Sequence, residues 1–105
     1  GQPLVSPPAT NEKLLANYTA AKQQYDANPR DPDAIIWLGR RLGYLGRFQE
    51  AIATFSRGIE LHPTNPRFYR HRGHRYLTTR QIDKAIADFR RAAALTRNQP
   101  DEIEP

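Results

Sequence analysis

The stretch that decides the fold runs from residue 32 to residue 97. Residues 32–65 read PDAIIWLGRRLGYLGRFQEAIATFSRGIELHPTN, and residues 66–97 read PRFYRHRGHRYLTTRQIDKAIADFRRAAALTR. A shift of 34 residues aligns identical side chains: Pro32 with Pro66, Gly39 with Gly73, Arg41 with Arg75, Ala51 with Ala85, Ile52 with Ile86, Ala53 with Ala87, Phe55 with Phe89, Arg57 with Arg91 and Leu61 with Leu95. Most of these are small or apolar, as close contacts between helices require. The chain therefore contains an internal repeat.

Each repeat carries the signals of two helices. Asp31-Pro32 and Asn65-Pro66 each place a capping side chain before a proline, a combination that begins a helix. The apolar stripes that follow are Ile35, Leu38, Leu42 and Leu45, then Phe48, Ile52, Phe55 and Ile59, and in the second repeat Tyr69, Gly73 and Tyr76, then Ile82, Ile86, Phe89 and Ala93. Gly46 suits the turn that ends the first helix, and Pro63 cannot continue the second. The pattern predicts helix hairpins over residues 32–65 and 66–97.

The flanking segments have different compositions. Residues 11–28 place apolar side chains at helical spacing and predict a leading helix that fits as the second half of a degenerate earlier repeat. Residues 1–10 hold three prolines and are expected to be a flexible lead-in, and residues 98–105 are expected to be an acidic tail or a linker. The predicted fold class is all-α, an α-solenoid of two antiparallel helix hairpins preceded by one extra helix.

Positive charge is concentrated in one segment. The net charge is +5 and thirteen of the sixteen cationic residues are arginine. Residues 61–82 contain five arginines and three histidines but no acid. Arg67, Arg70, His71 and His74 are spaced so that one face of a helix carries all four. Because arginine grips carboxylates and phosphates with paired hydrogen bonds, an acidic ligand is the natural inference, and the alternative is a merely solvated basic face.

The repeat resembles the tetratricopeptide repeat (TPR) family, whose unit places small residues at its helix crossings. Leu38, Gly39, Ala51, Phe55 and Pro63 fall on the family's motif slots in the first unit, and Gly73, Tyr76, Ala85 and Phe89 do so in the second. The sequence departs from the motif at Ile35 and Leu42, where the family usually has Trp and Tyr, and at Arg97, which replaces the closing proline. Arg72 occupies an ordinarily apolar slot, so its stem is expected on apolar surface with its charged head in water.

The resemblance implies a concave groove lined by the first helix of each unit. It offers to a ligand Asp33, Ile36, Trp37, Arg40 and Tyr44 from the first unit, and Arg67, Arg70, His71, His74 and Thr78 from the second. Trp37 and Tyr44 then form an aromatic floor for a peptide, or, in the other interpretation, Trp37 packs on the leading helix. The ligand-binding candidates are Ile36, Trp37, Arg40, Tyr44, Arg67, Arg70, His71 and His74.

The function that follows is a non-catalytic scaffold that binds a protein or peptide, expected to be acidic. Nucleic-acid binding through the basic face is the alternative, suggested by Tyr69 and Tyr76 among the arginines. Two units and one helix are fewer than the three repeats that usually make a stable array. We therefore expect either a fragment of a longer protein or self-association through exposed end helices.

Other classes of function find little support in the sequence. The chain has no cysteine and two serines, and no histidine lies near an acid at a productive spacing, so we expect no enzyme activity. His71 and His74 lie one helical turn apart, but the arginines around them would repel a cation, so no metal site or cofactor is expected. No apolar run is long enough to span a membrane, and the compartment is not indicated.

Overall fold

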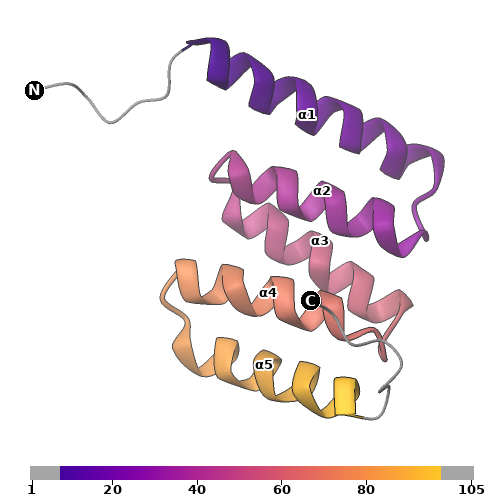
Figure 1. The fold of residues 1–105 in the computed structure, drawn as a ribbon, viewed down its shortest axis with the longest axis vertical. Helices are drawn as coiled ribbons and strands as arrows, with labels where there is room; N and C mark the ends of the chain where they lie inside the picture. The colour runs from indigo at the N-terminus through magenta and orange to yellow at the C-terminus, as the bar shows by residue number, and fades with distance from the viewer. Residues whose placement is uncertain (1–7, 98–105) are drawn as a thin grey trace, which may run out of the picture.

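The computed structural model describes residues 8–97 of the 105 in the chain. It contains five helices over this range: α1 (Pro8–Ala27), α2 (Pro32–Tyr44), α3 (Phe48–Leu61), α4 (Pro66–Thr78) and α5 (Ile82–Arg97). Consecutive helices pack against each other and run in alternating directions, which produces a stack along the long axis of the molecule (Figure 1). Helices α2 and α4 also contact each other. The predicted all-α architecture of two hairpins preceded by one helix is confirmed over the described residues.

The helix boundaries follow the local signals in the sequence. The Asp31 carboxylate accepts a hydrogen bond from the Ala34 amide at 2.9 Å, and the Asn65 side chain accepts one from the Arg67 amide at 3.0 Å. Both caps stand directly before a proline in the first turn of a helix. Helix α1 begins at Pro8, so the expectation of a lead-in up to residue 10 is wrong for its last three residues. The expected acidic tail, residues 98–105, lies outside the described residues.

The two hairpin turns have the same backbone geometry although their sequences differ. Gly46 has φ 78°, in the left-handed region that glycine adopts without strain, and Arg80, 34 residues later, has φ 63°. In both turns the next amide bonds back into the preceding helix, from Arg47 to the Leu42 carbonyl and from Gln81 to the Tyr76 carbonyl. The second hairpin therefore closes without the glycine that marks the first.

Aromatic rings inserted over glycines set the distance between the helices. Phe55 of α3 is 1% exposed, and its ring lies where a Cβ atom on Gly39 of α2 would stand. The Phe89 ring lies against Gly73 in the same way one repeat later. Ala51 and Ala85 are fully buried beside these crossings. The small and aromatic residues that recur in the sequence are thus the residues of the helix contacts.

A buried ion pair joins the two helices of the second unit. The Arg72 guanidinium donates hydrogen bonds to both oxygens of the Asp88 carboxylate at 2.8 Å, and a third to the Ser56 hydroxyl at 3.1 Å. The side chains of Arg72 and Asp88 are 20% and 6% exposed. The Asp88 carboxylate raises the pKa of Arg72 above its ordinary value, chiefly through its hydrogen bonds with the guanidinium. The expectation that the Arg72 head lies in water is wrong, because a carboxylate sixteen residues away takes the place of solvent.

Gly39→Ala is expected to lower the free energy of unfolding by about 1–3 kcal/mol, because the added methyl group overlaps the Phe55 ring. This overrides the better helix propensity of alanine. Urea unfolding followed by circular dichroism measures the change. Gln49→Ala, at an exposed position of α3, is the control and should stay within about 0.5 kcal/mol of wild type. A Gly39→Ala protein as stable as wild type would contradict the close crossing.

Asp88→Ala leaves the Arg72 guanidinium without its carboxylate and is expected to cost about 3 kcal/mol, the lower end for breaking a buried pair. The corresponding residues of the first unit are Leu38 and Thr54. The double variant Arg72→Leu, Asp88→Thr reproduces that pair and should recover most of the loss, as measured by urea unfolding. Asp26→Ala breaks the exposed pair with Lys22 as a control and should cost under about 1 kcal/mol. Equal costs for Asp88→Ala and Asp26→Ala would show that burial does not matter here.

Candidate functional site

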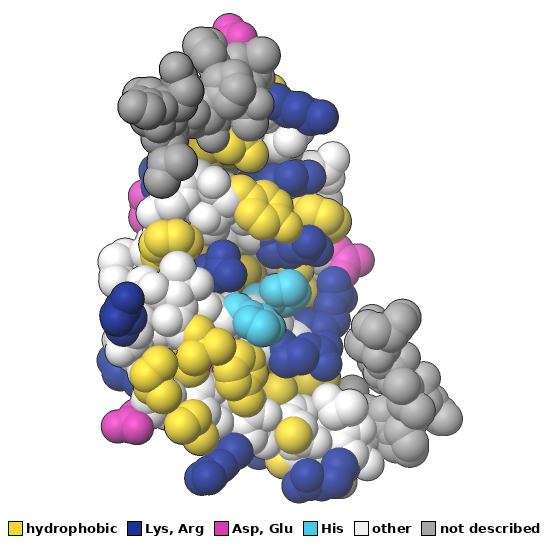
Figure 2. All heavy atoms as spheres, turned by 60° about the vertical axis from the view of Figure 1, so that its left-hand side comes forward, with side chains coloured by type: hydrophobic (Ala, Val, Ile, Leu, Met, Phe, Trp, Pro, Cys, Tyr) yellow, Lys and Arg dark blue, Asp and Glu magenta, His cyan; other side chains and the backbone are white. Residues whose placement is uncertain are grey.

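The candidate site is the groove between α2 and α4, the first helices of the two units. A small pocket of about 170 Å³ lies in it, lined by Arg40, Tyr44, Phe55, His71, His74 and Arg75. Four of the predicted ligand-binding residues, Arg40, Tyr44, His71 and His74, thus meet in one place although they come from different repeats. Figure 2 shows histidine side chains among Lys and Arg side chains and apolar groups on one face of the molecule. No carboxylate lines this pocket.

His71 lies half-buried at the bottom of the groove. Its ring stacks on Phe55 with centroids 5.4 Å apart and an interplanar angle of 18°. Burial lowers the pKa of His71 to about 4, and the neighbouring charges of Arg40, Arg67, Arg70 and His74 act in the same direction. His71 is therefore neutral at physiological pH, and the groove holds it as an uncharged aromatic ring.

Arg40 is held in place by aromatic side chains of its own helix. Its guanidinium donates a hydrogen bond to the Tyr44 hydroxyl at 2.9 Å and lies 4.4 Å from the centre of the Trp37 ring. Such contacts reduce the number of conformations that an arginine must give up when it binds an anion. Tyr44 is 46% exposed, so its ring keeps a free surface in the groove.

The remaining predicted residues lie in different environments. Arg67 forms an ion pair with Asp33 at 2.9 Å, which links α4 to α2 at their N-terminal ends. Arg70 is half-buried and has no ion-pair partner among residues 8–97. Ile36 is 1% exposed and belongs to the core, so the expectation that it is offered to a ligand is wrong. The unpaired guanidinium groups that line the pocket are therefore Arg40 and Arg75, and Arg70 stays a predicted groove residue.

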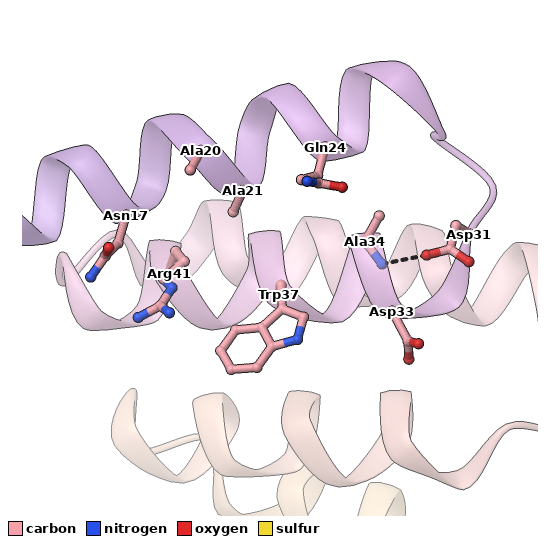
Figure 3. A pocket seen from close by; sticks show the side chains of 9 residues that line it. All are labelled: Asn17, Ala20, Ala21, Gln24, Asp31, Asp33, Ala34, Trp37 and Arg41. Carbon is pink, nitrogen blue, oxygen red and sulfur yellow. Dashed lines mark hydrogen bonds between the residues drawn. The ribbon is translucent and has the colours of Figure 1, made fainter.

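Trp37 combines features of both interpretations drawn from the sequence. Its side chain is 41% exposed, and it lines a second pocket together with Ala20 and Ala21 of α1, the leading helix (Figure 3). The Arg40 and Arg41 guanidinium groups lie 4.4 and 4.9 Å from its ring centre. Trp37 is thus neither a buried core residue nor a free surface residue.

Sequence reasoning did not place Arg75 or Phe55 at the site. Arg75 lines the pocket, packs against Gly43 and Phe48, and has a buried Nε atom that finds no hydrogen-bond partner within the described chain. The repeat contains a signal for Arg75. Most residues that are identical in the two units are small or apolar, but Arg41 and Arg75 share one position and are charged. The sequence predicts Phe55 only as a core residue, and the structure places it in the core and also at the floor of the groove.

Residues 8–97 contain no group of three or more side chains that is suited to hold a metal ion. None of the helices described is long and apolar enough to cross a membrane. At the end of the stack, Leu77, Ile82 and Ile86 are between 43% and 49% exposed. The self-association predicted for this end therefore has an apolar surface available, and it stays a prediction.

Comparisons with known structures agree on the fold. MamA (MSR-1) is 26% identical, with a TM-score of 0.76 over 86% of this chain and 52% of the MamA chain. The translocator chaperone SycD of Yersinia enterocolitica is 19% identical, with a TM-score of 0.78 over 89% of this chain and 70% of its own. PcrH, solved in complex with the chaperone binding region of PopD, is 24% identical, with the same TM-score and coverage. The chain spans about half the length of the MamA chain.

Comparison with curated protein sequences gives no match. The sequence pattern of the tetratricopeptide repeat, by contrast, matches residues 32–65 and 66–99, which together are more than half of the chain. These matches begin at the two prolines that follow the helix caps, and each of them includes one complete hairpin. The chain therefore belongs to the tetratricopeptide repeat family.

Proposed function

We propose that this chain is a non-catalytic binding module that holds an acidic segment of a protein or peptide in the groove between α2 and α4. The observation that carries the proposal is the pocket in which the Arg40 and Arg75 guanidinium groups converge, beside His71 and His74, without a carboxylate among its lining residues. Like charges placed together in a folded protein repel one another unless an anion compensates them. A carboxylate from a partner would supply this compensation.

The arrangement of the groove supports a peptide rather than a small ion. The charged groups come from both helices, Arg40 from α2 and Arg75 from α4, and Tyr44 and His71 provide ring surface between them. A bound segment would meet charge at an acidic position and ring surface at its neighbours. PcrH, which shares the fold, was solved with a segment of another protein bound, which supports the same mode of use here.

Nucleic acid is the second candidate partner, supported by the net charge of +5 and by the Trp37 and Tyr44 rings beside Arg40. The affinity of a protein for the phosphates of a nucleic acid falls steeply as the salt concentration rises. Titration with generic single-stranded RNA and DNA at two salt concentrations separates it from peptide binding. We favour the acidic peptide because the cations line a pocket instead of an extended flat track.

The double variant Arg40→Ala, Arg70→Ala is expected to weaken the binding of an acidic peptide about 5- to 30-fold, since each half-exposed ion pair contributes about 0.5–1 kcal/mol. A peptide of alternating Glu and Ala is the probe, with its Gln counterpart as the uncharged reference. Calorimetry at low and moderate salt gives the affinity, and the variant should also show a flatter salt dependence.

The matched control is Arg57→Ala, Arg91→Ala, which removes the same charge from exposed positions of α3 and α5. It should change the affinity by less than threefold, about 0.7 kcal/mol. Equal losses in the two double variants would mean that only the total charge matters, and the groove assignment would then be wrong.

Binding of the acidic peptide is expected to strengthen as the pH falls from 7 to 5. The free protein holds the pKa of His71 at about 4, so His71 is neutral in this range, and a bound carboxylate favours the protonated ring and raises that pKa. Binding therefore takes up protons. If the ligand restores about two pKa units, the affinity rises about tenfold between pH 7 and pH 5, while glutamate, with a pKa near 4.3, stays mostly ionised.

Calorimetry in buffers of different ionisation enthalpy measures this proton uptake directly. His71→Gln keeps a polar side chain of similar size but cannot be protonated, and it should lose most of the increase. An increase of the same size in the His71→Gln protein would assign the linkage to another group and remove His71 from the site.

A further inference from the structure

A second pocket lies outside the α2–α4 groove, between α1 and α2. Its volume is about 270 Å³. Asn17, Ala20, Ala21 and Gln24 line it from α1, and Trp37 and Arg41 line it from α2; Figure 3 shows the Trp37 ring on the side of α2 away from α1. Alanine side chains form much of its wall, and the exposed Trp37 ring stands beside them.

The internal repeat explains why this space is open. A shift of 34 residues places α1 on α3 and α2 on α4, so Ala21 corresponds to Phe55 and Ala34 corresponds to Phe68. At the α3–α4 junction the Phe55 ring stacks on His71, and the Phe68 ring fills the space over Gly58. At the α1–α2 junction both rings are replaced by methyl groups, and both alanines line the pocket.

Trp37 stands at the position that corresponds to His71. His71 has the Phe55 ring stacked on it, whereas the Trp37 ring has the Arg40 and Arg41 guanidinium groups 4.4 and 4.9 Å from its centre and no stacked aromatic ring among residues 8–97. An aromatic ring placed above Ala21 and against Trp37 would restore the contact that the second junction makes internally. Ring pairs of this kind stabilise a complex beyond the area that they bury.

The charges beside the pocket specify what must accompany the ring. Asp31 caps α2 at the helix end whose dipole favours a negative charge, and Asp33 is paired with Arg67, so each acid at this end has a favourable partner within the fold. Arg41 lines the pocket and has no carboxylate partner in the described part of the chain. The unsatisfied charge is therefore positive, and it favours an anionic neighbour of the bound ring.

We propose that the α1–α2 pocket binds an aromatic side chain of a partner protein segment, with the ring stacked on Trp37 and an adjacent carboxylate paired with Arg41. The partner is thus an acidic segment that carries Phe, Tyr or Trp next to Asp or Glu. The inference rests on the proposed function for the acidic character of the partner, and it adds a distinct subsite for an apolar anchor.

The probes are two capped dipeptides, N-acetyl-phenylalanyl-glutamic acid amide and N-acetyl-alanyl-glutamic acid amide. Trp37 is the single tryptophan of the chain, so its fluorescence reports occupancy, and amide shifts of Ala20 and Ala21 report it independently by NMR. The phenylalanyl probe is expected to bind about tenfold more tightly than the alanyl probe, because it buries most of a ring. Equal affinities for wild-type protein would overturn the inference.

Ala21→Phe supplies the missing ring from within the chain, as Phe55 does one repeat later. It should raise the melting temperature and reduce the preference for the phenylalanyl probe to about one. Gln23→Phe is the control, because Gln23 is exposed on the same helix and does not line the pocket, and it should keep the tenfold preference. A preference that survives Ala21→Phe would overturn the inference.

Trp37→Ala gives a second route should Ala21→Phe disturb folding, with calorimetry as the readout. It should remove the preference for the ring while leaving the dependence on glutamate intact, and a preference that survives would also overturn the inference. Arg70→Ala, which leaves Trp37 and its neighbours Arg40 and Arg41 in place, should weaken the Glu-Ala peptide without changing the ratio of the two dipeptides. A different outcome separates the two proposals. If the phenylalanyl dipeptide still binds more tightly than the alanyl one, but the Glu-Ala peptide binds no better than its Gln counterpart, the proposed function is wrong and the α1–α2 pocket is still a binding site.

Discussion

The contact on which the structure depends is the insertion of an aromatic ring over a glycine at the α2–α3, α3–α4 and α4–α5 crossings. Phe55 over Gly39 and Phe89 over Gly73 fix the distance between the helices of each unit, and Phe68 over Gly58 fixes the distance between the units. Because glycine has no Cβ atom, the two backbones can approach closely, and the aromatic ring opposite the glycine fills the space between them. Because neighbouring crossings use the same geometry, the helices stack regularly and α2 and α4 lie next to each other.

The groove is a consequence of this packing. Its floor is the Phe55 ring, which also packs on Gly39 at the α2–α3 crossing, and His71 of α4 stacks on that ring. The burial that stabilises the stack also lowers the pKa of His71. A substitution that loosens the packing around His71 would therefore also change its protonation.

Two arginines of the second unit show how burial sorts similar side chains into different roles. Arg72 lies among the helix contacts and is fully engaged by Asp88 and Ser56, so it acts within the fold. Arg75, three residues later, turns toward the groove, and its buried Nε atom lacks a partner within residues 8–97. Sequence spacing alone assigns neither role, since both residues belong to the same positively charged helix.

The sequence by itself determined the helices, their pairing and the repeat, because caps, prolines and apolar periodicity act over a few residues and recur at a fixed interval. Helical periodicity also predicts which side chains share a face, and Arg40, Tyr44, His71 and His74, named on that basis, line one pocket. The sequence did not indicate that Ile36 is buried, that Arg80 takes the backbone conformation of Gly46, or that Arg72 meets Asp88. These were decided only by the tertiary structure, because burial, a partner's position and the strain that a turn can tolerate depend on contacts between distant segments.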